Sequence, residues 1–388
     1  MNLRQPKSEN PLVSFPVRAW LLGLFLVLAG GSAADTGQEG ALTEVQAMIE
    51  ELGLQESAIA VRDMPGWRKP RKVVAWVDRP ERLQALQAAA PGVEIVLAES
   101  DGQLAEEVTD AQVLLGSCAE EVLAKGPELH WIQVYSAGVE RCVDNPGLQQ
   151  VDRVLTNGQR IASPALAEHA IALMMALVRG LDVYHANQLE GAWRRNVGLE
   201  RSDFMELEGR TVLVVGLGGI GTQTARRAHG LGMRVIATRG SRREGPVYVD
   251  YVGLADEALE LARQADVVIN TVPLTDQTRG MFDAAFFKAM KSSAYFVSVG
   301  RGASTVTEDL IAALNNGELA GAGLDVTDPE PLPAGHPLWS TPRVLISPHT
   351  AGRSDKGRDR LYLLVAENLR RYVAGDPLLS VVDIQRGY

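Results

Sequence analysis

The chain has 388 residues, of which 46% are hydrophobic and 22% are charged, a composition typical of a globular protein with more than one domain. Its formal net charge of −10 argues against a nucleic-acid partner, and none is expected. Two cysteines, Cys118 and Cys142, are too few for a cysteine-rich metal site, so no metal is predicted. They are either free thiols or one disulfide.

The N-terminus has the features of a secretory signal peptide. Basic residues precede an apolar stretch from Ala19 to Leu28, and small residues from Ser32 to Ala34 offer a cleavage site before Asp35. The stretch is short for a transmembrane span. We therefore expect residues 1 to 34 to be a leader that is cleaved or tethers the chain to a membrane, with a misassigned start or a spurious hydrophobic leader as the alternative.

The next segments predict an extension and then a first α/β domain. Apolar residues from Ala41 to Leu54 recur near helical spacing and predict a short amphipathic helix, so residues 35 to 71 are interpreted as an N-terminal extension. From Lys72 onward, short apolar runs alternate with helix-length segments such as Pro80 to Ala90. The expected strands are Val73 to Val77, Val93 to Leu97, Val113 to Leu115 and Ile132 to Tyr135. This domain is expected to cover residues 72 to 165.

A segment from Pro164 to Arg179 is apolar on nearly every face, which predicts a buried helix that links two domains. Glu168 and His169 within it are expected to be hydrogen-bonded helix residues rather than catalysts. Further strands are expected at Val267 to Thr271, Tyr295 to Val299, Gly321 to Val326 and Val344 to Ile346. The second domain is therefore placed at residues 166 to 352. The final helix, Asp359 to Ala374, is expected to return to the first domain, to which residues 353 to 388 are assigned.

The most specific motif is VLVVGLGGIG, which ends in a G-x-G-x-x-G pattern. The β-branched run Thr211 to Val215 suits a central parallel strand, Thr222 to Leu231 can be helical, and a second strand is expected at Met233 to Thr238. Backbone N–H groups and the helix dipole at such a turn can hold a pyrophosphate, whereas the alternative is an ordinary α/β turn. The expected cofactor-binding residues are Gly216, Gly218, Gly219, Ile220 and Gly221.

The residues after the second strand predict which dinucleotide binds. An NAD site places Asp or Glu about 20 residues after the turn, and an Arg nearby accommodates the 2′-phosphate of NADP. Here the chain has Arg239, Arg242 and Arg243, with no carboxylate before Glu244. Because guanidinium groups pair bidentately with phosphate, we expect NADP, with NAD as the second choice and a solvated basic loop as the alternative.

Three polar residues, Arg301, Glu330 and His349, follow expected strands of the second domain. Open parallel sheets bind ligands at the carboxyl ends of their strands, so these side chains should meet there. Hydride transfer to a carbonyl needs an acid for the oxygen and a cation for an anionic substrate, which are roles for histidine and arginine. A carboxylate beside the imidazole would stabilise its protonated form. We expect these three residues to be catalytic.

From about residue 72 to 375 the chain resembles the D-isomer-specific 2-hydroxyacid dehydrogenase family. The matching segments are YSAGVE at 135 to 140, ALAEHAIALMMALVR at 165 to 179, VGLGGIGTQTARRA at 215 to 228, TVPLTDQTRGMF at 271 to 282, VSVGRGASTVTEDLIAAL at 297 to 314, GAGLDVTDPEPLP at 321 to 333 and SPHTAG at 347 to 352. The resemblance implies an α/β fold of two Rossmann-like domains, flavodoxin-like for the substrate and doubly wound for the dinucleotide, with the active cleft between them.

The resemblance also implies roles for individual residues. It makes His349 the acid/base, Glu330 its partner and Arg301 the residue that binds the substrate carboxylate and carbonyl. Backbone groups around Ser136, Ala137 and Gly138 would grip the carboxylate, Asp325 would meet the nicotinamide carboxamide, and Pro273, Thr278 and Gly300 would also line the cofactor site.

Departures from the family pattern narrow the expected activity. Arg239 in place of the usual acid is typical of the NADP-using glyoxylate and hydroxypyruvate reductases, and Glu330 disfavours the formate dehydrogenases, which have an amide there. We therefore expect an NADP(H)-preferring enzyme that interconverts a small 2-oxo acid and its D-2-hydroxy acid, as a homodimer. The leader suggests export, whereas the cofactor suggests the cytoplasm. The alternative from another class is a dinucleotide-sensing corepressor of the same fold.

Overall fold

The computed structural model describes residues 33–76, 80–149, 152–195 and 204–385. The chain divides into two compact units, Met1–Thr43 and Glu44–Tyr388, and helix α1 (Ala33–Leu52) begins in the first and ends in the second. This helix starts earlier than expected. The expected leader falls almost wholly outside the described residues, so its cleavage stays a prediction. Within the described ranges, no helix combines the length and the apolar character needed to cross a bilayer.

The first sheet has five parallel strands in the order β2-β1-β3-β4-β5. The strands are β1 (Lys72–Trp76), β2 (Glu94–Ala98), β3 (Val113–Leu115), β4 (Trp131–Gln133) and β5 (Val154–Thr156). Sequence patterns predicted the first four to within two residues and missed β5, which is only three residues long. This strand order is the flavodoxin-like arrangement.

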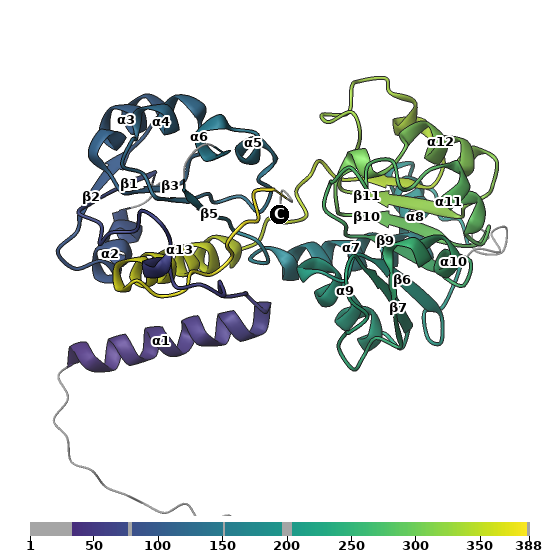
Figure 1. Ribbon diagram of the computed structural model, residues 1–388. Helices are drawn as coiled ribbons and strands as arrows, with labels where there is room; N and C mark the ends of the chain where they lie inside the picture. The colour runs from purple at the N-terminus through teal and green to yellow at the C-terminus, as the bar shows by residue number, and fades with distance from the viewer. Residues whose placement is uncertain (1–32, 77–79, 150–151, 196–203, 386–388) are drawn as a thin grey trace, which may run out of the picture. The chain divides into compact units, whose positions relative to one another are not determined.

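Helices cover the first sheet on both faces (Figure 1). They are α2 (Pro80–Ala89), α3 (Asp101–Glu107), α4 (Glu120–Lys125), α5 (Glu140–Val143), α6 (Pro146–Gln149) and the C-terminal α13 (Gly357–Ala374). Tyr372 of α13 is buried and stacks on Trp131 of β4, with ring centroids 5.1 Å apart. The last helix of the chain therefore packs on the first sheet.

The second sheet has seven parallel strands in the order β12-β11-β10-β9-β6-β7-β8. The strands are β6 (Thr211–Val215), β7 (Arg234–Arg239), β8 (Tyr251–Leu254), β9 (Val267–Asn270), β10 (Tyr295–Ser298), β11 (Gly321–Leu324) and β12 (Val344–Ile346). Sequence patterns missed β8. This order is the doubly wound dinucleotide-binding arrangement, in which the strand order reverses between β6 and β9 and ligands bind at the carboxyl ends of the strands.

Two apolar clusters cover the two faces of the second sheet. Its helices are α7 (Ser163–Val178), α8 (Leu181–Leu189), α9 (Gly219–Gly230), α10 (Ala258–Ala262), α11 (Ala284–Ala289) and α12 (Thr307–Asn315). Helix α7 is buried along much of its length, as predicted. Its Glu168 accepts a 2.6 Å ion pair from Arg227, and its His169 lies 2.7 Å from the Ser347 hydroxyl, so both are hydrogen-bonded helix residues. The expected α/β fold of two Rossmann-type sheets is confirmed.

Candidate functional site

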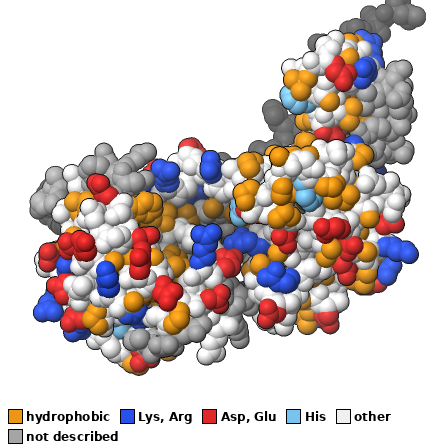
Figure 2. Space-filling model, turned by 90° about the horizontal axis from the view of Figure 1, so that it is seen from above, with side chains coloured by type: hydrophobic (Ala, Val, Ile, Leu, Met, Phe, Trp, Pro, Cys, Tyr) orange, Lys and Arg blue, Asp and Glu red, His pale blue; other side chains and the backbone are white. Residues whose placement is uncertain are grey.

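A cavity of about 2270 Å³ opens at the carboxyl ends of both sheets. The last residue of β1 and the residues directly after β2, β3 and β4 line it on one side, and residues after β6, β7, β9 and β10 line it on the other. Figure 2 shows several Lys and Arg side chains close together near the middle of the face in view. The cavity is larger than the roughly 300–1,000 Å³ of ordinary small-ligand pockets, so it has room for a dinucleotide and a second small molecule.

The glycine turn after β6 forms part of the cavity wall. Gly216 has φ +98°, and a Cβ atom there would lie 3.0 Å from Val272, so a side chain would strain the turn. A Cβ atom on Gly221 would lie 2.1 Å from the carbonyl oxygen of Gly216, so this glycine permits close packing of helix and strand. Gly216, Gly218, Gly219 and Ile220 line the cavity, whereas Gly221 packs behind them. Helix α9 begins at Gly219, three residues before the expected start.

Two of the three guanidiniums predicted at and after the end of β7 line the cavity. Arg239 and Arg242 lie on its wall, and within the described ranges neither forms an ion pair. The Nε atom of Arg239 is buried without a hydrogen-bond partner. Burial lowers the pKa of Arg239, and the neighbouring charge of Arg242 lowers it further, against a smaller opposing effect of Glu244. Arg243 points elsewhere, since its guanidinium pairs with Glu257 at 2.8 Å.

Loops after β9 and β10 complete the dinucleotide side of the cavity. Pro273 and Thr278 line it, and the Thr278 hydroxyl donates a 2.6 Å hydrogen bond to the Pro273 carbonyl while it accepts one from the Thr275 amide at 2.8 Å. Gly300 lines the same wall, and its carbonyl accepts a 3.0 Å hydrogen bond from Arg301. These bonds hold both loops in compact conformations at the cavity edge.

His349 and Glu330 form a close pair at the cavity wall. The Nδ1 atom of His349 lies 2.6 Å from a carboxylate oxygen of Glu330, and both side chains are roughly half exposed. His349 has a positive φ of 53°, an uncommon conformation for a residue other than glycine. Its backbone N–H donates to the Asp325 carbonyl at 2.8 Å. With Nδ1 engaged by the carboxylate, Nε2 is the ring nitrogen left for a ligand.

Asp325 supports the loop that carries His349 and is not among the residues that line the cavity. Its buried carboxylate accepts hydrogen bonds from the Ser347 hydroxyl at 2.7 Å and from the backbone N–H groups of Thr350 and Ala351 at 3.0 Å each. The structure therefore gives this carboxylate a positioning role under the His349 loop. Its expected contact with the nicotinamide stays a prediction.

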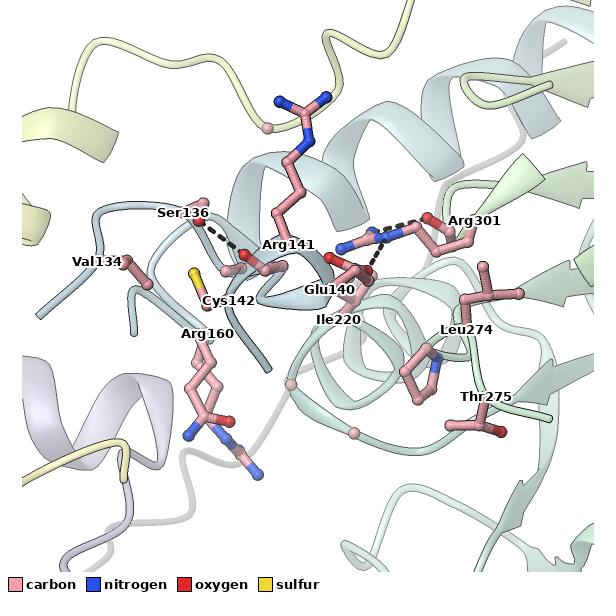
Figure 3. A pocket seen from close by; sticks show the side chains of 18 of the residues that line it. Val134, Ser136, Glu140, Arg141, Cys142, Arg160, Ile220, Leu274, Thr275 and Arg301 are labelled. Atoms are coloured by element: carbon pink, nitrogen blue, oxygen red, sulfur yellow. Dashed lines mark hydrogen bonds and ion pairs between the residues drawn. The ribbon is translucent and has the colours of Figure 1, made fainter. Parts of the chain in front are cut away.

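Arg301 is paired across the cavity with Glu140, which is the first residue of α5 (Figure 3). The Arg301 Nε atom donates to a Glu140 carboxylate oxygen at 3.0 Å. Burial pushes the pKa of Glu140 up, but its own backbone N–H and the Arg301 guanidinium outweigh burial and hold this pKa below its usual value. Glu140 is the last residue of the motif YSAGVE, and the sequence alone predicted no role for it.

The loop with Ser136, Ala137 and Gly138 lines the cavity opposite Arg301. The Ser136 hydroxyl donates to the Gly138 carbonyl at 2.7 Å, and the Asn157 amide donates to the Ala137 carbonyl at 2.7 Å. A Cβ atom on Gly138 would lie 2.8 Å from an Nη atom of Arg301. The glycine therefore lets this loop approach the guanidinium closely.

Cys118 and Cys142 form a disulfide, which settles the alternative left open by the sequence. Both residues line the cavity. The bond joins the loop after β3 to helix α5, and the Asn145 side-chain amide joins the same two segments by donating to the Cys118 carbonyl at 3.0 Å. Because α5 begins with Glu140, the disulfide also limits where that carboxylate can move.

Arg160 is a cavity residue that sequence analysis missed. It lies between β5 and α7 and has φ +69°. Burial lowers the pKa of its guanidinium, and the charges of Arg239 and Arg242 lower it further. No sequence motif predicts its position, because Arg160 lies in the cavity only through the packing of the segment between β5 and α7 against the glycine turn.

The fold and the cavity define a dinucleotide-binding α/β protein with two parallel sheets. Residues 171–351 match the family model described as D-isomer specific 2-hydroxyacid dehydrogenase, NAD binding domain. A glyoxylate reductase from Pyrococcus furiosus is 33% identical over 287 residues, which cover 71% of this chain and 83% of that protein. The chain belongs to the D-isomer-specific 2-hydroxyacid dehydrogenase family, and it is an NAD(P)-dependent enzyme of that family.

Solved structures agree with this assignment. A D-isomer specific 2-hydroxyacid dehydrogenase from Xanthobacter autotrophicus, in complex with NADPH and MES, is 29% identical with a TM-score of 0.71 and covers 82% of this chain and 100% of its own. An NADPH-dependent glyoxylate/hydroxypyruvate reductase from Sinorhizobium meliloti, in complex with NADP and sulfate, is 27% identical with a TM-score of 0.68 and covers 82% of this chain and 99% of its own. The family resemblance seen in the sequence motifs is confirmed.

Proposed function

We propose that this enzyme reduces a small 2-oxo acid, such as glyoxylate or hydroxypyruvate, to the D-2-hydroxy acid and that it prefers NADPH. The observation that carries the proposal is the shared cavity: the His349–Glu330 pair and Arg301 line the same space as the glycine turn. Similar proteins are named glyoxylate reductase and NADPH-dependent glyoxylate/hydroxypyruvate reductase, which supports the substrate class.

In the proposed mechanism, each residue has one task. The dinucleotide, when bound, supplies the hydride that is added to C2 of the oxo acid. Arg301 and the loop from Ser136 to Gly138 bind the substrate carboxylate and orient the carbonyl. His349 donates the proton from Nε2 to the carbonyl oxygen, and Glu330 holds the ring through Nδ1 and offsets the charge of the imidazolium. Proton donation by His349 thus completes the conversion of the carbonyl group to a hydroxyl group.

The proposed preference for NADPH rests on Arg239 and Arg242. Both guanidiniums line the cavity beyond β7 without an ion pair in the described part of the chain, and the Arg239 Nε atom has no hydrogen-bond partner. A phosphate on the ribose would supply the charge and the acceptor that these groups lack. Arg243 is left out of this proposal, because it is paired with Glu257.

Three further parts of the proposal concern the whole chain. We assign residues 72–165 and 353–388 to a substrate domain and residues 166–352 to an NAD(P)-binding domain that includes the linking helix. We also propose a homodimer, since α8 and the segment after it expose Leu189 and Trp193, which are 77% and 87% accessible. Light scattering tests the dimer. N-terminal sequencing and cell fractionation test the proposed leader over residues 1–34.

The function is tested by a steady-state screen of small 2-oxo acids with NADPH and NADH. We expect turnover of glyoxylate or hydroxypyruvate, a D-configured product from substrates that give a chiral alcohol, and a higher kcat/KM with NADPH. Turnover with equal or better kcat/KM for NADH would remove the cofactor preference alone. Absence of turnover with every oxo acid, despite dinucleotide binding, would instead favour the corepressor-like alternative.

A further inference from the structure

Arg160 carries a positive charge in the cavity that the proposed mechanism does not use. In Figure 3 it lies apart from the paired Glu140 and Arg301. Its side chain makes a hydrogen bond from Nη1 to the Leu52 carbonyl at 3.3 Å, and among the described residues it forms no ion pair with a carboxylate. This single carbonyl replaces only part of the hydration that a partly buried cation loses, and it brings no opposite charge.

Two other cations make this position more costly. Arg239 and Arg242 both act on Arg160 as like charges, which is why they add to the lowering of its pKa by burial. Arg239 is itself partly buried, and its Nε atom has no acceptor. The three guanidiniums repel one another, and the Arg239 N–H donor has no acceptor. An anion bound among them would neutralise the charge and accept that hydrogen bond.

The position of Arg160 indicates the kind of anion that would bind there. Its Cγ atom would lie 2.8 Å from a Cβ atom on Gly219, the first residue of the 12-residue helix α9. The stem of Arg160 therefore occupies the space that a side chain at Gly219 would fill. This places the residue beside the turn that receives the phosphates of a dinucleotide.

We propose that Arg160 binds a phosphate group of the dinucleotide together with Arg239 and Arg242. The proposal rests on the proposed dinucleotide function of the cavity, and it adds a ligand from outside the glycine turn and the β7 loop. Arg160 belongs to the segment that leads from β5 of the first sheet into α7. Through this residue, the cofactor is bound by both the second sheet and the connection from the first.

The test measures binding of nucleotide fragments by calorimetry, with no reaction involved. The probes are 2′,5′-ADP, 5′-ADP and 5′-AMP, which add to adenosine 5′-phosphate either a 2′-phosphate, a second 5′-phosphate or nothing. The variants are Arg160→Gln and Arg160→Lys. Arg243→Gln is the matched control, because it removes the same charge from a nearby guanidinium that is paired outside the cavity.

We expect Arg160→Gln to weaken at least one of the two diphosphates about 10-fold or more relative to the control, and Arg160→Lys to restore part of the loss. A loss confined to 2′,5′-ADP assigns Arg160 to the 2′-phosphate, and a loss on 5′-ADP assigns it to the pyrophosphate. Affinities equal to those of the control for all three probes, in a variant with unchanged thermal unfolding, would overturn the proposal.

The same measurements test the NADPH preference independently of the role of Arg160. If the unaltered enzyme binds 2′,5′-ADP no better than 5′-AMP, the proposed NADPH preference fails, while the 5′-ADP measurement still decides the role of Arg160. The lysine variant also guards against misfolding of the glutamine variant. A merely structural arginine would change the unfolding temperature and leave the affinities of both 2′,5′-ADP and 5′-ADP, each relative to that of 5′-AMP, unchanged.

Discussion

The two ends of the cavity differ in how their charges are arranged. At the dinucleotide end, Arg160, Arg239 and Arg242 gather without an ion pair in the described part of the chain. At the substrate end, Arg301 is paired with Glu140 and His349 is paired with Glu330. The substrate end is also cross-linked by a disulfide next to the ion pair.

This difference shows how each end meets its ligand. Cations without an ion-pair partner gain an attraction when an anionic cofactor binds, and no existing ion pair has to break. At the substrate end, the proposed mechanism makes a substrate carboxylate compete with Glu140 for Arg301, so we expect binding there to be an exchange between two anions. We expect substitutions at the dinucleotide end to change affinity directly, and those at the substrate end to change how the exchange proceeds.

The largest effect is expected from His349→Ala, which removes the proposed general acid from the substrate end. General acid catalysis contributes roughly 10²- to 10⁴-fold, so the rate of reduction should fall by that order. Dinucleotide affinity should stay near that of the unaltered enzyme, because the cations at the other end are intact. Single-turnover absorbance and fluorescence titration measure the two quantities. Near-normal turnover would contradict the role of His349.

The second-largest effect is expected from breaking the disulfide, which should affect the substrate end and leave the dinucleotide end unchanged. The cysteines are 24 residues apart in sequence, and cross-links of such loops stabilise a protein by about 3 kcal/mol. The double variant Cys118→Ser and Cys142→Ser should lose free energy of unfolding of that order and should raise KM for the oxo acid. Its dinucleotide affinity should not change. Denaturant unfolding and fluorescence titration check this, with reductant on the unaltered enzyme as the parallel experiment.

At the dinucleotide end, Arg239→Asp should reverse the cofactor preference. It removes an attraction to the 2′-phosphate and adds a repulsion, and one charged hydrogen bond contributes about 1.5 to 3 kcal/mol, or roughly 10- to 150-fold in affinity. Kd values for NADPH and NADH at low and high salt measure this, because screening weakens interactions between exposed charges. A variant that keeps the preference of the unaltered enzyme would show that the arginine cluster is only a solvated loop.

The sequence predicted local features of the fold well. The strand, glycine turn and helix from Thr211 onward follow from residue order alone, because β-branched runs and glycines limit the backbone directly. Strands β5 and β8 were missed, although β3, which is as short as β5, was predicted. Both missed segments are strands through the hydrogen bonds of a neighbouring strand, β4 for β5 and β7 for β8.

The position of a residue in the cavity was predicted where that residue follows its own strand. His349, Glu330 and Arg301 share the cavity because parallel strands end at one edge. Contacts between sheets could not be predicted from the sequence, and these include the pairing of Glu140 with Arg301 and the presence of Arg160. In the same way, nothing in the sequence shows that Arg243 turns away toward Glu257, since that depends on strand β8.

The smallest expected effect, from Glu140→Gln, tests the exchange directly. The ion pair with Arg301 is partly exposed, and such pairs contribute about 0.2 to 1 kcal/mol, so the affinity for an anionic substrate or for oxalate should rise by up to about fivefold. The neutral glutamine keeps the size of the side chain and removes the competing charge.

The pH dependence of that gain has a definite sign. Because the pKa of Glu140 lies below its usual value, the carboxylate is ionised at neutral pH, and the advantage of the glutamine variant should be complete there. As the pH falls through the lowered pKa, Glu140 of the unaltered enzyme becomes protonated and releases Arg301, so the two enzymes should converge. Oxalate inhibition constants measured from neutral to acidic pH follow this, with Glu168→Gln as a control on an ion pair outside the cavity. A glutamine variant that binds oxalate more weakly at neutral pH would mean that Glu140 positions Arg301 for the substrate instead of competing with it.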